Sequence, residues 1–414
     1  MLIIKIAWRN IIKNLRKSLV TLILGVMCCT LMVFYESFNE GSRGKMIDDS
    51  VAMFDGYLQI HGKDYQDHPN YDNLIYDVAE VKEKIKDIKG IKSYTTRLQT
   101  FALYSGKGDS VGGMLVGVDP STEKDISRII RGLQDGRFLK DNDTNAVYIG
   151  KDLAKKLEVG LGDEVVIISS AVDYSMAATK LRVCGIFQTN FFEFDSRAAF
   201  INKKFMDTEF LADNVASHIV IQPDKKDNTF ILQKKIIGVL DKKKYEVFSW
   251  REMADDLVQF MKIDYTFDHI SFALLLIIVF FVIMIFSLIS IFQRSKEIGI
   301  MRAIGTTHKQ VYLILFTEIL ILAVISVILG GIFGSMIALH FQNHPIVLNF
   351  DSDLMDMYKQ WGIYDLTMPA KLNMKSFLSG VIPVFLLILL AVWYPAWKVN
   401  QLKPIEAIEE RKYV

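Results

Sequence analysis

Apolar and polar residues are arranged along this chain in long alternating blocks. Four apolar runs without a charged residue cover positions 18–35, 270–292, 319–339 and 377–397. A helix rises about 1.5 Å per residue, so each run is long enough to cross a hydrocarbon layer of about 30 Å. The pattern therefore predicts four transmembrane helices, which we place at residues 18–37, 269–293, 311–340 and 376–397.

The first apolar run has a second interpretation, because a charged start and an apolar core also describe a secretory signal peptide. The run is long for such a core, and no small-residue cleavage site follows it. Met27 precedes Cys28 at the position where a lipoprotein signal needs a small residue. These features favour a retained transmembrane helix.

Residues 1–17, which precede this run, place apolar and basic side chains on opposite sides of a helix. The apolar side consists of Ile4, Trp8, Ile11, Ile12 and Leu15, and the basic side of Lys5, Arg9, Lys13, Arg16 and Lys17. The segment contains no acidic residue. It is therefore predicted to be a cytoplasmic amphipathic helix that lies on an anionic leaflet.

Lys and Arg residues beside the apolar runs indicate the orientation in the membrane. They gather in residues 1–17, in the loop at 294–310 and in the tail at 398–414. Short segments rich in Lys and Arg stay in the cytoplasm, so these three are predicted to be cytoplasmic. The short loop at 341–375 and the large polar segment at 38–268 are then predicted to be extracytoplasmic.

The large polar segment alternates between strand-like and helix-like patterns. The strand-like stretches are 57–61, 93–104, 113–118, 165–170, 180–186 and 218–222, and the helix-like ones are 76–88, 146–157 and 229–240. Gly106, Gly108 and Asp109 mark a hairpin turn, and a strand-rich middle begins near Asp119. We therefore expect a membrane α-helical protein with a large α/β extracytoplasmic domain.

The composition agrees with this mixture, since 51% of the 414 residues are hydrophobic and 23% are charged. The net charge is +1, and the polar part contains no long basic run with interleaved aromatic residues. This argues against nucleic-acid binding. Of the three cysteines, Cys28 and Cys29 are adjacent and Cys184 is alone, so no disulfide framework or zinc site is predicted within one chain.

Candidate catalytic and metal-binding patterns are few. No GxxxxGK[ST] phosphate loop occurs, so the chain is predicted not to be an enzyme and to hold no cofactor or catalytic residue. His340 and His344 have the spacing of a helical metal pair, but Pro345 ends the helix there, so no metal site is predicted. Glu318, inside the third apolar helix, is predicted either to face protein or water or to extend to the membrane interface.

The loop at 294–310 is compatible with a helix of about four turns from Arg294 to Lys309. Its polar face consists of Lys296, Glu297, Arg302, His308 and Lys309, and its apolar face of Ile298, Ile300, Met301 and Ile304. Gly299 and Gly305 permit close backbone approach. The pattern predicts a docking element rather than a simple connection, although an ordinary positive loop fits the spacing as well.

The residues Glu297, Gly299, Arg302, Ala303 and Gly305 resemble the ExGxxRAxG signature of the FtsX-like, MacB-type (type VII) ABC permeases. Thr306 replaces the Ala that often follows the second Gly in that family. The resemblance implies that residues 294–310 form a coupling helix, with ATPase coupling by Glu297, Gly299, Arg302, Ala303, Gly305 and Thr306. It also implies a separate ABC ATPase, in two copies, that binds the ATP and Mg.

The same resemblance extends over essentially the whole chain. Its motifs are GYLQIH at 56–61, VGVDP at 116–120, the phrase at 145–166, and the closing YPAWK and LKPIEA at 394–398 and 402–407. They imply a porter-like part at 38–118 and 210–265 and a sabre-like insertion at 119–209. The sequence resembles the lipoprotein-releasing LolC/LolE branch most, although Tyr57 stands where that branch commonly has His.

This branch implies extraction of lipoproteins from the inner membrane of a bacterium, driven by mechanotransmission from the ATPase. The implied partners are a second permease copy or homologue, a lipoprotein cargo, a periplasmic lipoprotein chaperone and membrane lipids. Two alternatives stay open: MacB-like efflux of peptides or small molecules, and FtsX-like signalling to a cell-wall hydrolase.

A lipoprotein leaves the bilayer only if its acyl chains find another apolar surface. The outer ends of the first and second transmembrane helices offer one. The candidate lipid or substrate path consists of Leu31, Phe34, Phe38, Phe267, Ile270 and Leu275. The alternative, that these side chains simply contact lipid or a neighbouring helix, stays open.

Overall fold

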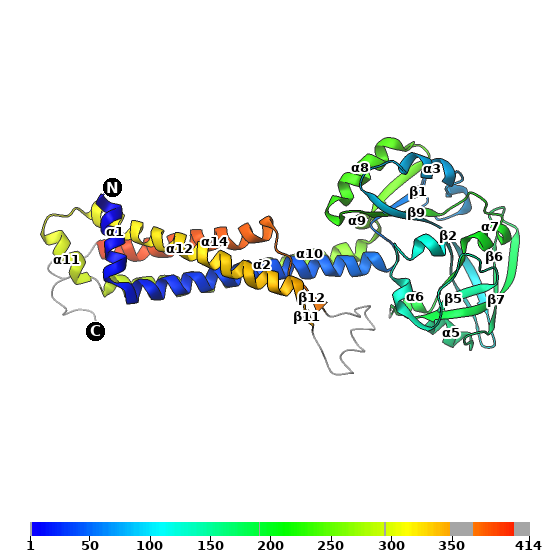
Figure 1. The fold of residues 1–414 in the computed structure, drawn as a ribbon, viewed down its shortest axis with the longest axis horizontal. Coiled ribbons are helices and arrows are strands. Elements are labelled where there is room, and N and C mark those ends of the chain that lie inside the picture. Colours follow the sequence, from blue (N-terminus) through cyan, green and yellow to red (C-terminus); the bar gives the residue numbers. More distant parts are fainter. Residues whose placement is uncertain (1, 190, 294, 348–366, 401–414) are drawn as a thin grey trace. The chain divides into compact units, whose positions relative to one another are not determined.

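The computed structural model describes residues 2–189, 191–293, 295–347 and 367–400 (Figure 1). The described chain divides into two compact units. The helical unit comprises the described parts of Met1–Met46, Met261–Leu348 and Thr367–Val414, and the α/β unit is Ile47–Phe260. Much of the predicted loop at 341–375 and most of the predicted tail at 398–414 lie outside the described residues.

The helical unit contains the predicted membrane helices. Its helices are α1 (Leu2–Lys13), α2 (Leu15–Met53), α10 (Asp255–Phe292), α11 (Ser295–Ala303), α12 (His308–Asn343) and α14 (Met374–Asn400). Among the described residues, four helices are long and apolar enough to cross a membrane, which confirms the four predicted spans. A short strand pair, β11 (Ile346–Val347) with β12 (Thr367–Met368), also belongs to this unit.

Two of these helices are longer than the apolar runs that predicted them. α2 continues from the predicted end at residue 37 to Met53, and α10 begins at Asp255 rather than at residue 269. Hydropathy misses these extensions because they are polar, while their backbone bonding continues as a helix. The division between the two units therefore falls inside both helices.

Glycines bring α12 close to α2 in the helical core. A Cβ placed on Gly330 would lie 2.5 Å from the Cβ of Cys29, and one on Gly334 would lie 2.8 Å from that of Val33. The Thr30 hydroxyl donates to the Gly330 carbonyl over 3.3 Å. The GxxxG pair that the sequence contains is therefore a helix-packing contact.

The first helix packs against α12 through only part of its apolar side. Ala7 and Ile11 are buried, whereas Ile4, Trp8 and Ile12 stay at least half exposed. Ile11 was predicted to face the membrane with the others, and that assignment is wrong because Ile11 lies on the side that packs within the protein. The remaining exposed stripe still has the pattern of an interfacial helix.

The α/β unit is built on one extended sheet. Its strands are β1 (Leu58–Gly62), β2 (Ile91–Ser105), β3 (Ser110–Val118), β4 (Leu133–Gly136), β5 (Ala146–Gly150), β6 (Glu164–Ser170), β7 (Met176–Phe187), β8 (Ala198–Asn202), β9 (His218–Pro223) and β10 (Tyr245–Ser249). Its α-helices are α3 (Val78–Ile85), α4 (Pro120–Glu123), α5 (Lys151–Lys156), α6 (Phe192–Asp195), α7 (Lys203–Glu209), α8 (Thr229–Val239) and α9 (Trp250–Met253).

The first part of this sheet has the order β10-β1-β9-β2, and all of its pairings are antiparallel. Helices α3 and α8 cover it, and their buried side chains share one core with β1 and β9. The core is therefore formed by two distant stretches of the chain, one on each side of the strand-rich middle.

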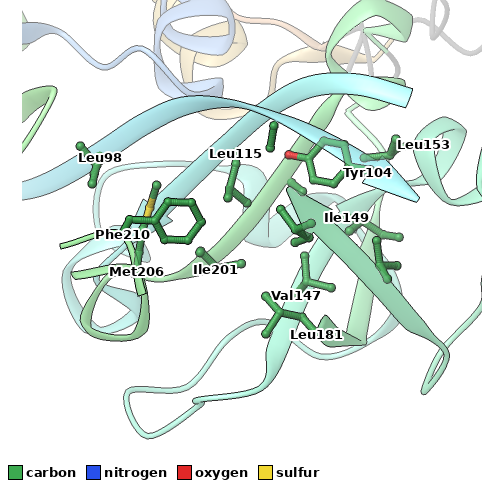
Figure 2. Close-up of a cluster of buried hydrophobic side chains, with 14 of the residues drawn as sticks. Leu98, Tyr104, Leu115, Val147, Ile149, Leu153, Leu181, Ile201, Met206 and Phe210 are labelled. Atoms are coloured by element: carbon green, nitrogen blue, oxygen red, sulfur yellow. The ribbon is translucent and has the colours of Figure 1, made fainter. Parts of the chain in front are cut away.

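The second part closes on itself. β2 pairs with β3, β3 with β8, β8 with β5, β5 with β7, β7 with β6, and β6 with β2. Alternate side chains of these strands point inward and fill the ring. Figure 2 shows Tyr104, Leu115, Val147 and Ile149 gathered inside it, with Leu98 toward Met206 and Phe210. The interior is a packed core rather than an open channel.

The structure places the boundary between the two parts differently from the sequence motifs. β2 pairs with β9 over its first half and with β3 and β6 over its second, so the core changes near Arg97 rather than at Asp119. The predicted helix at 146–157 is also partly wrong, because it begins as strand β5. Gly150 is the last residue of that strand, and it must be a glycine because a Cβ there would lie 2.1 Å from the Asp195 carbonyl oxygen.

Candidate ATPase-docking and transmission site

Helix α11 connects two membrane helices and presents an apolar surface to solvent. Ile298 is buried in the core of the helical unit, and Met301 packs partly against the same core. Ile300 and Ile304, by contrast, are 51% and 79% exposed. One side of the helix is therefore fixed to the bundle, and the other carries exposed side chains that favour a protein partner.

The predicted four-turn helix is wrong at its end, because α11 stops at Ala303 and α12 begins at His308. The Gly305 amide donates to the Arg302 carbonyl over 3.0 Å, and the Thr306 amide donates to the Met301 carbonyl over 3.1 Å. These two bonds form a Schellman motif, in which the residue before the last one is left-handed. Gly305 is this residue, with a φ of +102°.

The structure therefore gives Gly305 another role than the predicted close backbone approach. A Cβ placed on this residue would meet nothing within 4 Å. What Gly305 provides is a backbone conformation that L residues with a side chain rarely adopt. Gly299, in contrast, is buried within the helix.

The charged residues of this segment bond to its surroundings. The Glu297 carboxylate lies 3.9 Å from the Lys13 ammonium at the end of α1. Arg302 Nη2 lies 2.8 Å from His308 Nε2, across the turn between α11 and α12. Ala303 is exposed and Thr306 is half-buried. Glu297 and Arg302 thus connect α11 to α1 and to α12, respectively.

The candidate lipid-path residues differ in their exposure. Leu31, Phe267 and Ile270 are exposed, but Leu275 packs against the core of the helical unit. The Phe34 ring lies 5.8 Å from Phe38 and 5.5 Å from Phe341 of α12 (centroid distances). The structure therefore brings Phe34 close to Phe38 and to Phe341 of α12.

The sequence interpretation missed a polar cluster between α2 and α10. The carboxylate of Asp268 on α10 accepts hydrogen bonds from three side chains of α2. These are Tyr35, Asn39 and Arg43, which are spaced at one helical turn. The regular spacing of polar residues at the end of the first apolar run was the signal that could have revealed it.

The last turns of α2 are tied into the α/β unit. Asp48 accepts hydrogen bonds from Tyr57 and Lys226, and Asp49 from Arg128. The Arg128 amide also donates to the Ala52 carbonyl over 2.9 Å. Burial and the bond to Asp48 raise the pKa of the Tyr57 phenol, so this group stays a donor at neutral pH.

A buried arginine on β2, the strand shared by both parts of the sheet, connects the end of α2 to the sheet. Arg97 on β2 is fully buried and bonds both oxygens of Glu123, at 3.1 Å from Nε and 2.6 Å from Nη2. Its Nη1 donates to the Phe54 carbonyl over 2.7 Å, and its guanidinium lies 4.1 Å from the Phe54 ring centroid. Arg97 therefore fastens the residue that follows α2 to the sheet and to α4.

Two buried histidines lie beside Arg97. His61 on β1 and His218 on β9 are register partners, and their rings stack with centroids 5.5 Å apart. Burial lowers the pKa of His61 to about 4. Burial, His61 and Arg97 together lower the pKa of His218 well below its usual value. Both imidazoles are thus neutral at neutral pH.

Comparison with known proteins gives matches over nearly the whole chain. The MacB-like periplasmic core domain matches residues 18–240, and the FtsX-like permease C-terminal domain matches residues 270–404. The lipoprotein-releasing system transmembrane protein LolC of Buchnera aphidicola subsp. Schizaphis graminum is 24% identical, with 94% of this chain and 93% of that protein covered. LolC of Xylella fastidiosa (strain 9a5c) is 22% identical, with 71% and 72% covered.

Two solved structures resemble parts of the chain. The periplasmic region of MacB from Actinobacillus actinomycetemcomitans matches with a TM-score of 0.39 and 14% identity, covering 53% of this chain and 98% of that one. The extracellular domain of the transporter YknZ from Gram-positive bacteria matches with a TM-score of 0.35 and 19% identity, covering 47% and 99%. With four membrane-spanning helices and both domain matches, the chain belongs to the FtsX-like ABC permeases with a MacB-like periplasmic core domain, and it is an inner-membrane protein with a large periplasmic domain.

Proposed function

We propose that this permease extracts lipoproteins from the inner membrane toward the outer membrane, using ATP that a separate ATPase subunit hydrolyses. The observation that carries the proposal is α11, a short helix fixed on one side and apolar on the exposed other side. The lipoprotein class of cargo is supported by the relatives named LolC, which match the chain over most of its length.

The docking step follows from the exposed side chains of α11. Ile300 and Ile304 would enter an apolar groove of the ATPase. Fully burying an exposed Ile contributes about 1.5–3 kcal/mol, and the half-exposed Ile300 would contribute about half as much. Two ATPase copies would each hold one α11, from this chain and from a second permease copy or homologue. ATP and Mg would be bound by the ATPase.

The transmission step follows from the way α11 and α2 are fixed. Ile298 and Met301 pack α11 on the bundle, so a displacement of α11 moves the bundle with it. At the other end, Asp48 and Asp49 tie α2 to Lys226 and Arg128 of the α/β unit, and the Phe54 carbonyl accepts a hydrogen bond from Arg97 of the sheet. Closure of the two ATPases would in this way move the periplasmic domain without a solute channel through the membrane.

The cargo step needs a surface for acyl chains, because each CH₂ group removed from the bilayer costs about 0.8 kcal/mol. Leu31, Phe267 and Ile270 are exposed apolar residues of α2 and α10 that would meet such chains. A soluble periplasmic chaperone would then receive the lipoprotein.

The test uses the complex of this chain with its ATPase in proteoliposomes. A photocrosslinking residue at Leu31, which is exposed, should capture a triacylated lipoprotein, whereas one at the buried Met32 serves as the control. Release to a soluble acceptor should require ATP. Crosslinks to phospholipid alone, without ATP-dependent release, would instead favour peptide efflux or signalling to a cell-wall hydrolase.

A further inference from the structure

One carboxylate on α10 collects the polar side chains of a whole stripe of α2. The Asp268 Oδ1 atom accepts hydrogen bonds from the Tyr35 hydroxyl at 2.7 Å and from Asn39 Nδ2 at 2.5 Å. The Oδ2 atom accepts from Arg43 Nη1 at 2.6 Å. Both oxygens are thus bonded, and the donors follow one another at intervals of four residues along α2.

The contact is continued by aromatic residues on the same stripe of α10. The Arg43 guanidinium lies 4.6 Å from the Tyr265 ring centroid, and the Tyr35 ring stacks on Phe272 with centroids 6.1 Å apart. Residues 265, 268 and 272 have the spacing that places them on one side of a helix. Two stripes, one from each helix, therefore face each other over about two turns.

This contact is shielded from water, which distinguishes it from an ordinary surface ion pair. The side chains of Arg43 and Asp268 are 12% and 14% exposed. Charge-assisted hydrogen bonds of this kind are about twice as strong as neutral ones, and separating them would leave a charge in a poorly solvated place. We therefore expect this contact to stay closed throughout the ATP hydrolysis cycle rather than to open in each turnover.

We infer that Asp268 is a positioning residue that fastens α2 and α10 together into a single rigid lever. The inference rests on the proposed function, because a lever has a role only if ATP-driven motion passes along these helices. Both helices continue from the helical unit into the α/β unit, so a fixed pair transmits a displacement that two independent helices would partly absorb. It follows that acyl chains do not pass through the seam between α2 and α10 of one chain.

The first experiment separates ATP hydrolysis from lipoprotein release. In the complex with its ATPase, Asp268→Ala should leave ATP hydrolysis in place but lower the lipoprotein released per ATP by about tenfold, equivalent to about 1.4 kcal/mol. Asp264→Ala, one turn earlier on α10, removes a carboxylate that makes none of the contacts described above and should match the wild type. Equal coupling in the Asp268 and Asp264 variants would overturn the inference.

The second experiment asks whether a covalent bond can replace the carboxylate. With Cys28, Cys29 and Cys184 replaced, the pair Asn39→Cys and Asp268→Cys is bridged by a short, reducible bis-methanethiosulfonate. A rigid lever predicts that bridging restores the lost coupling and that reduction removes it again. A seam that must open for cargo predicts the opposite, namely that bridging abolishes release while the reduced form works.

The outcomes remain distinguishable from failure of the proposed function. If the cysteine-free parent complex releases no lipoprotein with ATP, the proposed function itself is wrong. If the parent releases lipoprotein but the bridged pair stays uncoupled or is blocked, only the role of Asp268 is refuted. Size-exclusion profiles and retention of the ATPase confirm that each variant is assembled.

Discussion

Removing the charge of Glu123 should destabilise the α/β unit more than any surface substitution. The Arg97 and Glu123 side chains are 0% and 2% exposed, so Glu123→Gln leaves a buried guanidinium without its counter-charge. Breaking a buried pair in this way costs about 3–5 kcal/mol. That is a large share of a typical total stability of about 5–15 kcal/mol.

The double variant Arg97→Met with Glu123→Leu provides the contrast. It removes both charges and replaces them with apolar side chains of similar volume, which is often close to neutral for stability. It nevertheless removes the hydrogen bond to the Phe54 carbonyl. We therefore expect a stable α/β unit in the double variant, but a weaker connection between the end of α2 and the sheet, visible as less release per ATP.

The stability effect can be measured on the full chain by the reactivity of Cys184, a half-buried thiol in strand β7. With Cys28 and Cys29 replaced, labelling of Cys184 reports opening of the α/β unit. At about 1.4 kcal/mol per tenfold, Glu123→Gln should speed labelling by about two to more than three orders of magnitude. If Glu123→Gln is labelled at the wild-type rate, the buried pair does not stabilise the α/β unit. If the double variant is labelled as fast as Glu123→Gln, replacing both charges with apolar side chains is not neutral for stability.

Three further predictions concern other parts of the chain. Burial lowers the folded-state pKa of His61 to about 4 and that of His218 well below its usual value, so the stability of the α/β unit should fall as the pH drops from about 6.5 toward 4, by about 3 kcal/mol from His61 alone. In thermal unfolding, His61→Asn should reduce this pH dependence without abolishing it, because His218 remains. Gly305→Ala should weaken ATPase retention by about 1–2 kcal/mol through left-handed backbone strain, with Gly305→Asn milder; equal binding by both variants and the wild type would contradict this. Gly334→Ala should destabilise the protein in thermal unfolding by about 1–3 kcal/mol, because the new methyl would lie 2.8 Å from the Cβ of Val33 on α2. Gly238→Ala on α8, where a methyl would meet nothing within 4 Å, should leave the stability unchanged.

The apolar runs were sufficient to predict the membrane helices, because burying about 20 residues in lipid leaves few alternatives to a helix. The polar extensions of α2 and α10 were missed for the complementary reason. Their backbone bonds continue past the apolar run, although hydropathy alone ends the helix there. The contacts of Asp268 depend on both helices and could not be read from either one.

The α/β unit shows a similar limit. Strand-like patterns revealed β1, whose sequence LQIHG alternates apolar and polar residues, although every one of its residues is buried. They missed β5 and β8, whose sequences AVYIG and AAFIN show no such alternation. In the predicted coupling segment at 294–310, the motif residues lie on α11 and in the turn that follows it. The role of Gly305 required the φ angle, since a glycine in a sequence permits both close packing and a left-handed turn.

In the proposed mechanism, force enters through the exposed side of α11 and drives the release of lipoprotein. The most direct measurement compares lipoprotein release per ATP in proteoliposomes between the wild-type complex and Ile304→Asp, whose side chain lies on that exposed side. We expect ATP-dependent release by the wild type, and loss of both ATPase binding and release in the variant. Release by the variant at the wild-type rate, with the ATPase retained, would contradict this mechanism.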